Sequence, residues 1–322
     1  MKKTLLICDY KNYTKKDLEK LSSKFYVIKK HFKDNQEFFI YLKKFPNSID
    51  ILFITIGFLI TDSLVKKFQK KLNIIFSPTT GKNHIKITNK EIQIITLLNI
   101  KNKIKKIQST SELTWGLILN LTRKIIPASK RNFLKKLNRE KYIGNDLLGK
   151  TILIIGYGRI GKQLSKFAKA FGMKIKIFEL QFNQSKKYLY KLLSISDIVV
   201  LSINYNHKNN KYFDNKCFTN MKKNSYFINT SRGELVDEKA LLYSLRKKDL
   251  GGAALDVLTN ENQINSKSNH PLINYSKKNT NLIITPHIGG ATFESFKKTR
   301  TCLIDNFLND KKIQFTKNKK VL

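Results

Sequence analysis

Short apolar runs alternate with stretches of helical spacing along most of the chain. In the N-terminal third, the apolar runs that predict β-strands lie at 3–8, 25–28, 51–55 and 74–76. The stretches between them that predict helices centre on residues 18–21, 38–42 and 64–72. This alternation of strand and helix predicts an α/β fold, in which helices cover both faces of a parallel sheet.

The rest of the chain opens with a long helix, predicted for residues 109–128. Thr110 or Ser111 is expected to cap its start, and Pro127 is expected to end it. Further strands are predicted at 151–155, 175–178, 198–201, 226–228, 253–255 and 282–284. Further helices are predicted at 160–171, 188–193, 238–246 and 292–307. The strand–helix alternation therefore continues into a second parallel sheet.

Residues 151–179 carry the most specific local pattern in the chain. Three glycines in the order GxGxxG (Gly156, Gly158 and Gly161) stand between the predicted strand and helix. The strand that follows ends on the acid Glu179. Strand, glycine turn, helix, strand and acid come in the order that a dinucleotide-binding βαβ unit requires.

Each part of this pattern has a physical role in holding a dinucleotide. In chain order, the three glycines permit a sharp turn, close approach of the pyrophosphate, and close packing of the helix. The N–H groups at the helix start, near Arg159 and Ile160, can bind the phosphates. Glu179 can accept hydrogen bonds from the ribose hydroxyls and would repel a 2′-phosphate. The motif therefore favours NAD over NADP.

Length and composition indicate a globular protein of two ordinary domains, with 322 residues of which 41% are hydrophobic. The N-terminal apolar run stops at Asp9, so no signal peptide is predicted. The longest apolar run, at 49–60, contains Asp50 and is not expected to span a membrane. Cys8, Cys217 and Cys302 are scattered, which indicates a reducing, cytoplasmic location without disulfides or a metal cluster.

The formal charge of +39 has two interpretations. It is compatible with a nucleic-acid or anionic-surface binder. It also fits a proteome biased towards Lys, Asn and Ile, because the basic residues are mostly lysines spread along the whole chain. A nucleic-acid surface would more often cluster its charges and use Arg for bidentate contacts. Composition bias is therefore favoured, and nucleic acid is not the expected partner.

Three polar residues follow predicted strands in glycine-containing turns: Arg232, Glu261 and His287. Arg232 offers a planar fork suited to a carboxylate. His287 can take or give a proton near neutral pH, and Glu261 supplies a carboxylate. Beside a nicotinamide, these groups are the equipment for moving a hydride to and from a 2-hydroxy acid. The sequence predicts no metal ligands.

With these motifs in this order, the sequence resembles the D-isomer-specific 2-hydroxyacid dehydrogenase family, which includes D-3-phosphoglycerate dehydrogenases. The similarity covers nearly the whole chain and is strongest at 109–292. Glu261 follows Arg232 by 29 positions, and His287 stands in the segment PHIGGAT, as in the family pattern. The resemblance implies that Arg232 binds the substrate carboxylate and keto oxygen. It implies that His287 is the acid or base, oriented by Glu261.

The resemblance also implies the remaining binding residues. Those assigned to the cofactor NAD are Thr110, Gly156, Gly158, Arg159, Ile160, Gly161, Glu179, Thr230, Ser231, Asp256, Gly289 and Gly290. Asp256 would contact the nicotinamide carboxamide. Those assigned to the substrate are Ile56, Gly57, Thr80 and Gly81, together with Arg232.

The expected architecture is two Rossmann-like, doubly wound parallel-sheet domains. An NAD-binding domain at 107–288 is expected to be inserted into a discontinuous substrate domain, formed by 1–106 and 289–322. The short chain leaves no room for a C-terminal regulatory domain. The family also implies a homodimer through the long helix of the NAD-binding domain.

Some positions depart from the family pattern. Lys86 stands where the family often has Asp, and the segment SINYNHKNN after residue 201 lacks the usual proline. The 2-hydroxy or 2-keto acid that serves as substrate stays open, with phosphoglycerate, glyoxylate, hydroxypyruvate and lactate among the candidates. A non-catalytic NAD(H)-sensing protein on the same fold is the alternative, and the intact Arg232, Glu261 and His287 argue against it.

Overall fold

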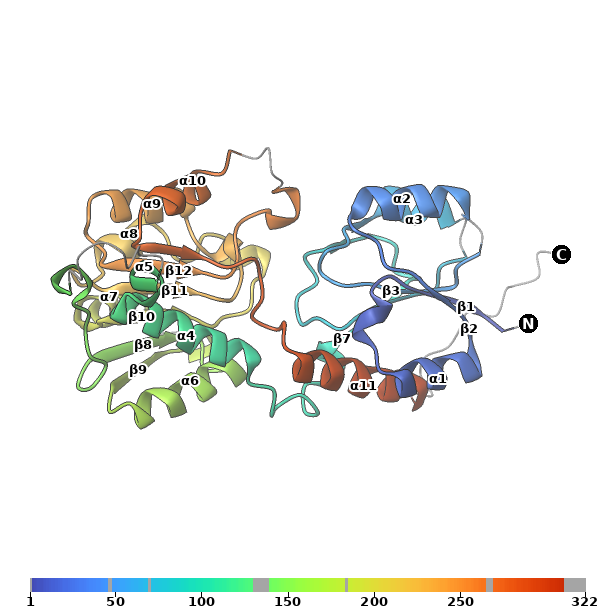
Figure 1. Cartoon of the computed structure of the whole chain (residues 1–322), viewed down its shortest axis with the longest axis horizontal. Helices are drawn as coiled ribbons and strands as arrows, with labels where there is room; N and C mark the ends of the chain where they lie inside the picture. The colour runs from blue at the N-terminus through green and yellow to red at the C-terminus, as the bar shows by residue number, and fades with distance from the viewer. Residues whose placement is uncertain are drawn as a thin grey trace. The chain divides into compact units, whose positions relative to one another are not determined.

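Two large parallel sheets make up the computed structural model of the chain (Figure 1). The structure describes residues 2–45, 48–68, 71–129, 139–182, 185–264 and 269–309. The chain divides into an N-terminal unit (Met1–Ile107 with Ala291–Leu322) and a central unit (Gln108–Gly290). The parallel α/β architecture predicted from the strand–helix alternation is confirmed in both units.

The sheet of the N-terminal unit has five parallel strands in the order β2-β1-β3-β5-β7. Its strands are β1 (Thr4–Ile7), β2 (Tyr26–Lys29), β3 (Ile51–Phe53), β5 (Ile74–Ser77) and β7 (Gln93–Thr96). Its helices are α1 (Lys15–Lys24), α2 (Asn35–Lys44), α3 (Asp62–Val65) and α11 (Phe293–Asn309). Two short strands, β4 (Ile60–Thr61) and β6 (Ile85–Lys86), pair separately.

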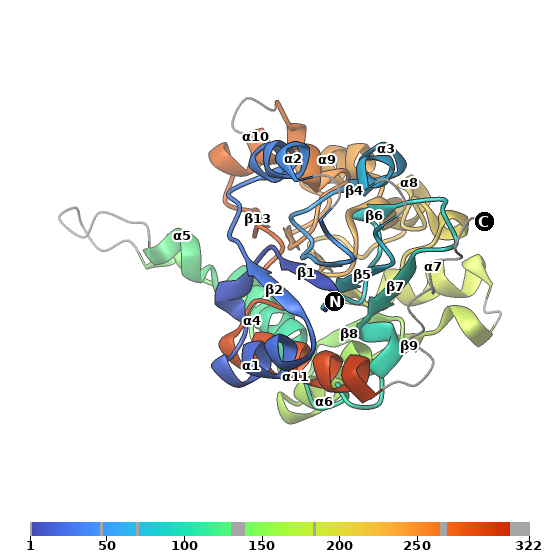
Figure 2. The same cartoon turned by 90° about the vertical axis from the view of Figure 1, so that its right-hand side faces the viewer.

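Alternate residues of each central strand face opposite layers of helices in this unit. Along β1, Leu5 and Ile7 pack in the core that contains α1 and α11, whereas Leu6 packs in the core that contains α2 and α3. Figure 2 shows α1 and α11 side by side on one face of this sheet, with α2 and α3 on the other. Such strands are buried on both faces, which explains their almost uninterrupted apolar sequence.

The sheet of the central unit has six parallel strands in the order β13-β12-β11-β10-β8-β9. Its strands are β8 (Thr151–Ile155), β9 (Lys174–Phe178), β10 (Ile198–Leu201), β11 (Tyr226–Asn229), β12 (Gly252–Leu255) and β13 (Leu282–Ile284). The order of the strands reverses between β8 and β10. In sheets of this kind, ligands bind at the carboxyl ends of the strands, beside the point of reversal.

Helices cover both faces of the central sheet. They are α4 (Ser109–Arg123), α5 (Ile125–Ser129), α6 (Arg159–Ala170), α7 (Lys186–Ile195), α8 (Asn215–Thr219), α9 (Glu238–Arg246) and α10 (Pro271–Lys278). Ile152 and Ile154 of β8 face α4 and α6, whereas Leu153 and Ile155 face the core with α7, α8 and α9. Figure 1 shows α4 and α6 on one side of the sheet and α8, α9 and α10 on the other.

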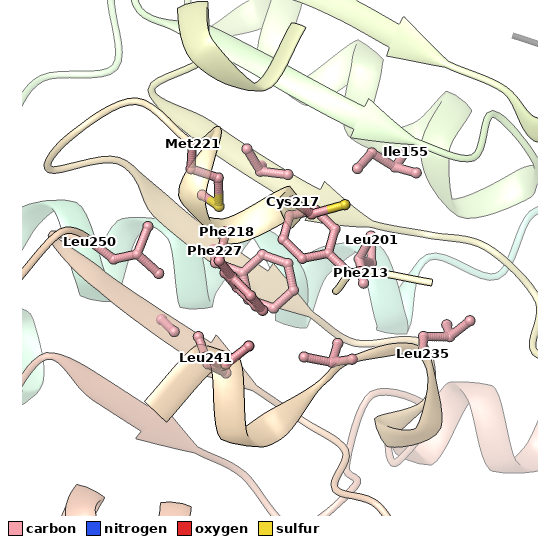
Figure 3. Close-up of a cluster of buried hydrophobic side chains, with 14 of the residues drawn as sticks. Ile155, Leu201, Phe213, Cys217, Phe218, Met221, Phe227, Leu235, Leu241 and Leu250 are labelled. Carbon is pink, nitrogen blue, oxygen red and sulfur yellow. The ribbon is translucent and has the colours of Figure 1, made fainter. Parts of the chain in front are cut away.

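Three phenylalanine rings form the centre of the core on the α7–α9 face (Figure 3). The Phe213 ring lies 4.7 Å from the rings of Phe218 and Phe227, and those two lie 5.2 Å apart. Truncating a buried aromatic to Ala costs about 3–5 kcal/mol. The core therefore gives the strand ends that carry the candidate site a stable support.

The single helix predicted over 109–128 is wrong in its extent and its caps. Lys124 has a left-handed backbone (φ 53°), which ends α4 at Arg123 before α5 begins. Gln108 stands at the N-cap without a side-chain bond, and Ser111 donates its hydroxyl to the Gln108 carbonyl (2.7 Å). Pro127 lies in the first turn of α5, where its missing N–H is tolerated.

The helix predicted at 64–72 is also wrong. α3 ends at Val65 and a 3-10 turn, Lys66–Phe68, follows. Residues 69 and 70 lie outside the described residues, and Leu72 is buried outside any helix. None of the helices in the described part of the chain has the length and apolar character needed to cross a membrane.

Candidate active site in the central unit

The three glycines of the loop after β8 differ in their surroundings. Gly156 has φ +97°, and a Cβ placed there would lie 2.6 Å from the Ser202 carbonyl oxygen. A Cβ on Gly161 would lie 2.2 Å from the Gly156 carbonyl oxygen. Both residues must be glycine, because any side chain there would collide with neighbouring backbone of the protein itself. At Gly158 a Cβ would meet nothing within 4 Å. Open space over the backbone there fits close approach of a pyrophosphate.

Arg159 begins α6 directly after this loop, with Gly158 as its N-cap residue. Burial lowers the pKa of the Arg159 guanidinium below its ordinary value, so its charge is partly removed from water. A phosphate at this helix start would offset that cost, because the helix dipole also favours an anion there. Ile160, the next residue, is half-buried.

Glu179 lies immediately after β9, beside the same loop. Its Oε2 accepts a hydrogen bond from the Tyr157 backbone N–H (2.6 Å). Since β9 pairs directly with β8, the acid stands next to the strand from which the glycine loop departs. The sequence pattern did not predict Ser202, whose Oγ donates to the Gly156 carbonyl (2.5 Å). No residue-type signature marks a serine that acts on a backbone carbonyl.

Asp256 organises the turn that follows β13. It is 1% exposed, and its carboxylate accepts hydrogen bonds from the Thr285 hydroxyl (2.6 Å), Ile288 N–H (2.9 Å) and Gly289 N–H (2.8 Å). Burial raises the pKa of Asp256, against the lowering effect of these bonds and of His287. Both carboxylate oxygens hold the turn, and the contact with a nicotinamide carboxamide stays a prediction.

Thr110, at the start of α4, lies beside this turn. A Cβ on Gly289 would lie 3.0 Å from Asp256 Oδ2 and 3.2 Å from Thr110 Cγ2, whereas a Cβ on Gly290 would meet nothing within 4 Å. The structure thus brings Thr110, Asp256 and Gly289 together.

His287 and Glu261 form a hydrogen-bonded pair, from His287 Nδ1 to Glu261 Oε1. The side chains are 22% and 30% exposed, so the pair is neither sealed off nor fully solvated. A carboxylate can only accept, so Nδ1 carries the proton in this contact. Nε2 is then the ring nitrogen that can exchange a proton with a substrate.

Arg232 follows β11 and is half-buried. Its Nη1 donates to the Ser231 carbonyl (2.5 Å). Burial lowers the pKa of the Arg232 guanidinium, while the carboxylates of Glu261, Glu234 and Asp256 oppose that shift. These opposing charges place Arg232 in the electrostatic field of the candidate acid–base pair.

Asn229 shapes the turn before Arg232. Its Nδ2 donates to the Arg232 carbonyl (2.8 Å), and its Oδ1 accepts from the Ser231 N–H (3.0 Å). The pattern did not predict this residue, although Asn at the start of a turn is the available signal. Thr230 Oγ1 lies 2.8 Å from Thr114 Oγ1, and Ser231 Oγ donates to the Leu201 carbonyl (2.9 Å). Both predicted cofactor residues therefore brace the turn.

The predicted substrate residues outside this cluster belong to the N-terminal unit. Ile56 and Gly57 come shortly after β3, and Thr80 and Gly81 after β5, at the carboxyl ends of adjacent strands. Thr79 Oγ1 donates to the Gly81 carbonyl (2.9 Å), which shapes the second of these loops. Within the described ranges, no three His, Cys, Asp or Glu side chains gather to form a metal site.

These features define an NAD-binding oxidoreductase. They are a glycine loop with room for a pyrophosphate, an acid at the next strand end, and a His–Glu pair with a half-buried Arg. Residues 115–289 match the family model described as "D-isomer specific 2-hydroxyacid dehydrogenase, NAD binding domain". The chain belongs to the D-isomer specific 2-hydroxyacid dehydrogenase family. It is an NAD-dependent oxidoreductase of D-2-hydroxy acids.

Named relatives support this membership. A glycerate dehydrogenase of Methylorubrum extorquens is 32% identical over 241 residues, which cover 73% of this chain and 74% of the relative. A D-3-phosphoglycerate dehydrogenase of Bacillus subtilis is 30% identical over 258 residues, covering 77% of this chain and 47% of the relative.

Solved structures share the fold. The TT0316 protein of Thermus thermophilus is 26% identical, with a TM-score of 0.74 over 95% of this chain and 96% of that one. A D-lactate dehydrogenase of Aquifex aeolicus, solved with NAD and lactic acid, is 22% identical. Its TM-score is 0.73, with 95% of both chains covered. This second likeness shows the fold alone.

Proposed function

We propose that Arg232, Glu261 and His287 carry the reaction of this dehydrogenase. The observation that supports the assignment is the His287–Glu261 hydrogen bond together with the half-buried Arg232, at the carboxyl ends of β11, β12 and β13. NAD, when bound, supplies the hydride acceptor, and NADH the donor. The remaining chemistry, which is binding of the carboxylate and movement of one proton, falls to these three side chains.

The roles follow from the chemistry of each group. The Arg232 guanidinium binds the substrate carboxylate and keto oxygen through its fork of N–H donors. In reduction, His287 gives a proton from Nε2 to the keto oxygen, and in oxidation it takes the hydroxyl proton back. Glu261 holds Nδ1–H and thereby keeps Nε2 directed at the substrate oxygen.

The cofactor residues are proposed by their places in the glycine loop and the adjoining turns. Gly158, Arg159 and Ile160 would hold the pyrophosphate, since open space and a helix start coincide there. Glu179 would accept from the ribose hydroxyls, because it is already oriented beside the loop by Tyr157. The turns after β11 and β13, with Thr110 beside the latter, would contact the nicotinamide end.

The N-terminal unit is proposed to bind the substrate. Ile56, Gly57, Thr80 and Gly81 would present backbone N–H groups to the substrate carboxylate. Their position at the carboxyl ends of β3 and β5 supports this role, since open parallel sheets bind ligands at that edge. The named relatives act on glycerate and D-3-phosphoglycerate, so a three-carbon hydroxy acid is the first candidate substrate.

An NADH-oxidation screen tests the proposed function. Purified protein is assayed with hydroxypyruvate, 3-phosphohydroxypyruvate, glyoxylate and pyruvate, and the panel is repeated with NADPH. We expect turnover of at least one 2-keto acid, with NADH preferred. A protein that binds NADH but reduces none of these acids would support the non-catalytic alternative.

We also propose a cytoplasmic homodimer. The central unit carries exposed large apolar side chains, among them Ile125, Ile143, Leu148 and Phe171. The support for the dimer is membership of the family, and these side chains are apolar surface that a second chain could cover. Cys8, Cys217 and Cys302 are all free, which supports a reducing compartment. Size-exclusion chromatography with light scattering measures the mass of the protein and so tests the dimer. Leu148→Asp should shift the protein from the dimer towards the monomer.

A further inference from the structure

Two left-handed backbone positions present the candidate acid–base pair. His287 itself has φ 54°, and Asn260, the residue before Glu261, has φ 53°. Residues with a side chain adopt this region at an energetic cost, which is smaller for Asn and His than for most others. They keep the conformation when their surroundings hold them there. Each of the two turns therefore needs contacts that hold its backbone in place.

The buried carboxylate of Asp256 holds the backbone of the His287 turn. It accepts from the N–H groups of Ile288 and Gly289, on the C-terminal side of the histidine. The backbone N–H of His287 donates to the Asp256 carbonyl (2.9 Å) as well. One acidic residue thus fixes the main chain around the histidine.

For the Glu261 turn, a second carboxylate takes the same part. Glu238, the first residue of α9, accepts from the Thr259 N–H through its Oε1 (2.7 Å). The neighbouring Leu258 N–H points to Glu261 Oε2 (3.4 Å). A Cβ on Gly233 would lie 2.2 Å from Thr259 N, so this backbone is also pressed against the turn that carries Arg232. The segment 258–261 is therefore held from two sides.

Glu238 is itself held by a histidine. His270 Nε2 lies 3.3 Å from Glu238 Oε2, and the two side chains are 14% and 19% exposed. His270 stands at the N-cap of α10, directly before Pro271. Its Nδ1 is buried and has no hydrogen-bond partner among the described residues. Among the described residues, the ring's polar contact is with Glu238. This contact joins the starts of α9 and α10 to the turn of Glu261.

We propose that Glu238, anchored by His270, is a positioning residue for the reaction: it fixes the turn that presents Glu261 to His287. Glu238 does not touch the reacting atoms. It acts through the Thr259 N–H, in the way that Asp256 acts on the His287 turn. The inference rests on the proposed roles of Glu261 and His287, and it assigns to a second His–Glu pair the task of orienting the first.

The first test reports which nitrogen of the His287 ring is protonated, and it does not depend on enzyme activity. In the full chain labelled with ¹⁵N-histidine, long-range ¹H–¹⁵N spectra at alkaline pH show which ring nitrogen of each of the five histidines carries the proton. Loss of signals in His287→Gln assigns that ring. We expect the proton on Nδ1 in the wild type, and a mixture of tautomers in Glu261→Gln and in Glu238→Ala.

Two variants separate positioning from loss of structure. Glu238→Gln keeps an amide oxygen that can accept from Thr259 N–H, so it should restore the Nδ1 proton. Glu37→Ala is the matched control, because Glu37 also lies in the first turn of a helix and accepts a backbone N–H, that of Lys33 (2.8 Å). Glu37 is in the N-terminal unit, and its loss should leave His287 unchanged.

Kinetics give the second readout. Glu238→Ala should lower kcat by up to about a hundredfold, the scale expected when a catalytic group is displaced by an ångström. The Kd for NADH should stay unchanged, because Glu238 lies far in sequence from the glycine loop and holds a different turn. His270→Ala should also lower kcat, but by a smaller factor.

The outcomes are distinguishable. A fixed Nδ1 proton and an unchanged kcat in Glu238→Ala would overturn the inference while leaving the proposed function intact. A wild-type protein that reduces no 2-keto acid would refute the proposed function, and the spectra would still decide whether Glu238 orients the pair. If Glu238→Ala does not fold, His270→Ala decides by the same two readouts.

Discussion

Ser202 donates its hydroxyl to the carbonyl oxygen of Gly156 at 2.5 Å, which ties the end of β10 to the glycine loop after β8. The same hydroxyl would lie 3.1 Å from a Cβ on Gly161. It therefore occupies the small space between the first and third glycines of the loop. β8 and β10 are the two strands between which the sheet order reverses, so this bond acts where a dinucleotide is expected.

Ser202→Ala should weaken NADH binding with little effect on the 2-keto acid. A hydrogen bond of this kind contributes about 1 kcal/mol, so we expect the Kd for NADH to rise about fivefold. Fluorescence titration with NADH measures it. Ser276→Ala is the matched control, because Ser276 also donates to a backbone carbonyl, that of Ile273 (2.9 Å), in α10. An unchanged Kd in Ser202→Ala would show that the loop keeps its shape without the bond.

Glu179→Ala should reduce the preference for NADH over NADPH. The carboxylate beside the glycine loop would repel a 2′-phosphate, and its removal abolishes that repulsion. The variant also loses the acceptor for Tyr157 N–H, so activity with NADH should fall. The measured quantity is the ratio of kcat/KM with NADPH to that with NADH. A ratio equal to that of the wild type would contradict the ribose assignment.

His287→Gln and Arg232→Lys should affect different kinetic constants. Loss of the proton donor in His287→Gln should lower kcat by about 10²–10⁴-fold. Arg232→Lys keeps the charge but loses the planar fork, so KM for the 2-keto acid should rise most. Steady-state kinetics with the best acid of the panel separate the two effects. Full activity in His287→Gln would remove this residue from the proton transfer.

The sequence predicted those parts of the fold and site whose cause is local. The glycine loop was visible because each glycine stands at a fixed offset between strand and helix. The layered fold was visible because strands buried on both faces have nearly continuous apolar sequences. Arg232 and His287 were visible because each stands in a turn directly after an apolar run.

What the sequence did not predict depends on contacts between distant segments. Ser202, Asn229 and Glu238 act on backbone atoms, so their side chains carry no recognisable motif. The break between α4 and α5 arises from the left-handed Lys124, a residue type that periodicity reads as helical. The strand β7 and the helix α10 were also missed, although a local signal was present in each: the pair Ile94–Ile95 in β7 and Pro271 at the start of α10.

Asp256 should make the stability of the central unit depend on pH. Burial raises the pKa of its carboxyl above 3.8, so the folded protein binds a proton more readily than the unfolded chain. The contribution of Asp256 to the free energy of unfolding is therefore complete below 3.8 and is lost as pH rises through the folded-state pKa.

Urea unfolding of the wild type and Asp256→Asn across this range measures the dependence. The wild-type free energy of unfolding, minus that of the variant, should decrease as pH increases from below 3.8. An increase with pH would mean that the hydrogen bonds from residues 285–289 outweigh burial and lower the pKa of this carboxyl.

The ion pair between Arg300 and Asp9 provides a stability prediction for the N-terminal unit. Arg300 Nη2 donates to Asp9 Oδ2 (2.6 Å), and the residues are 2% and 5% exposed. The guanidinium also lies 5.2 Å from the centre of the Tyr13 ring and 4.5 Å from that of Phe296. The pair thereby joins α11 to the end of β1, two segments from opposite ends of the chain.

Removal of one partner should cost much more than removal of both. Arg300→Met leaves the Asp9 carboxylate buried without its counter-charge, so the free energy of unfolding should fall by about 3–5 kcal/mol. Asp9→Leu combined with Arg300→Met removes both buried charges and should recover most of that loss. Lys20→Met, which breaks the more exposed Lys20–Asp305 pair with the same helix, should have a far smaller effect. Equal losses in the single and double variants would mean that packing of the arginine stem, and not its charge, holds α11 in place.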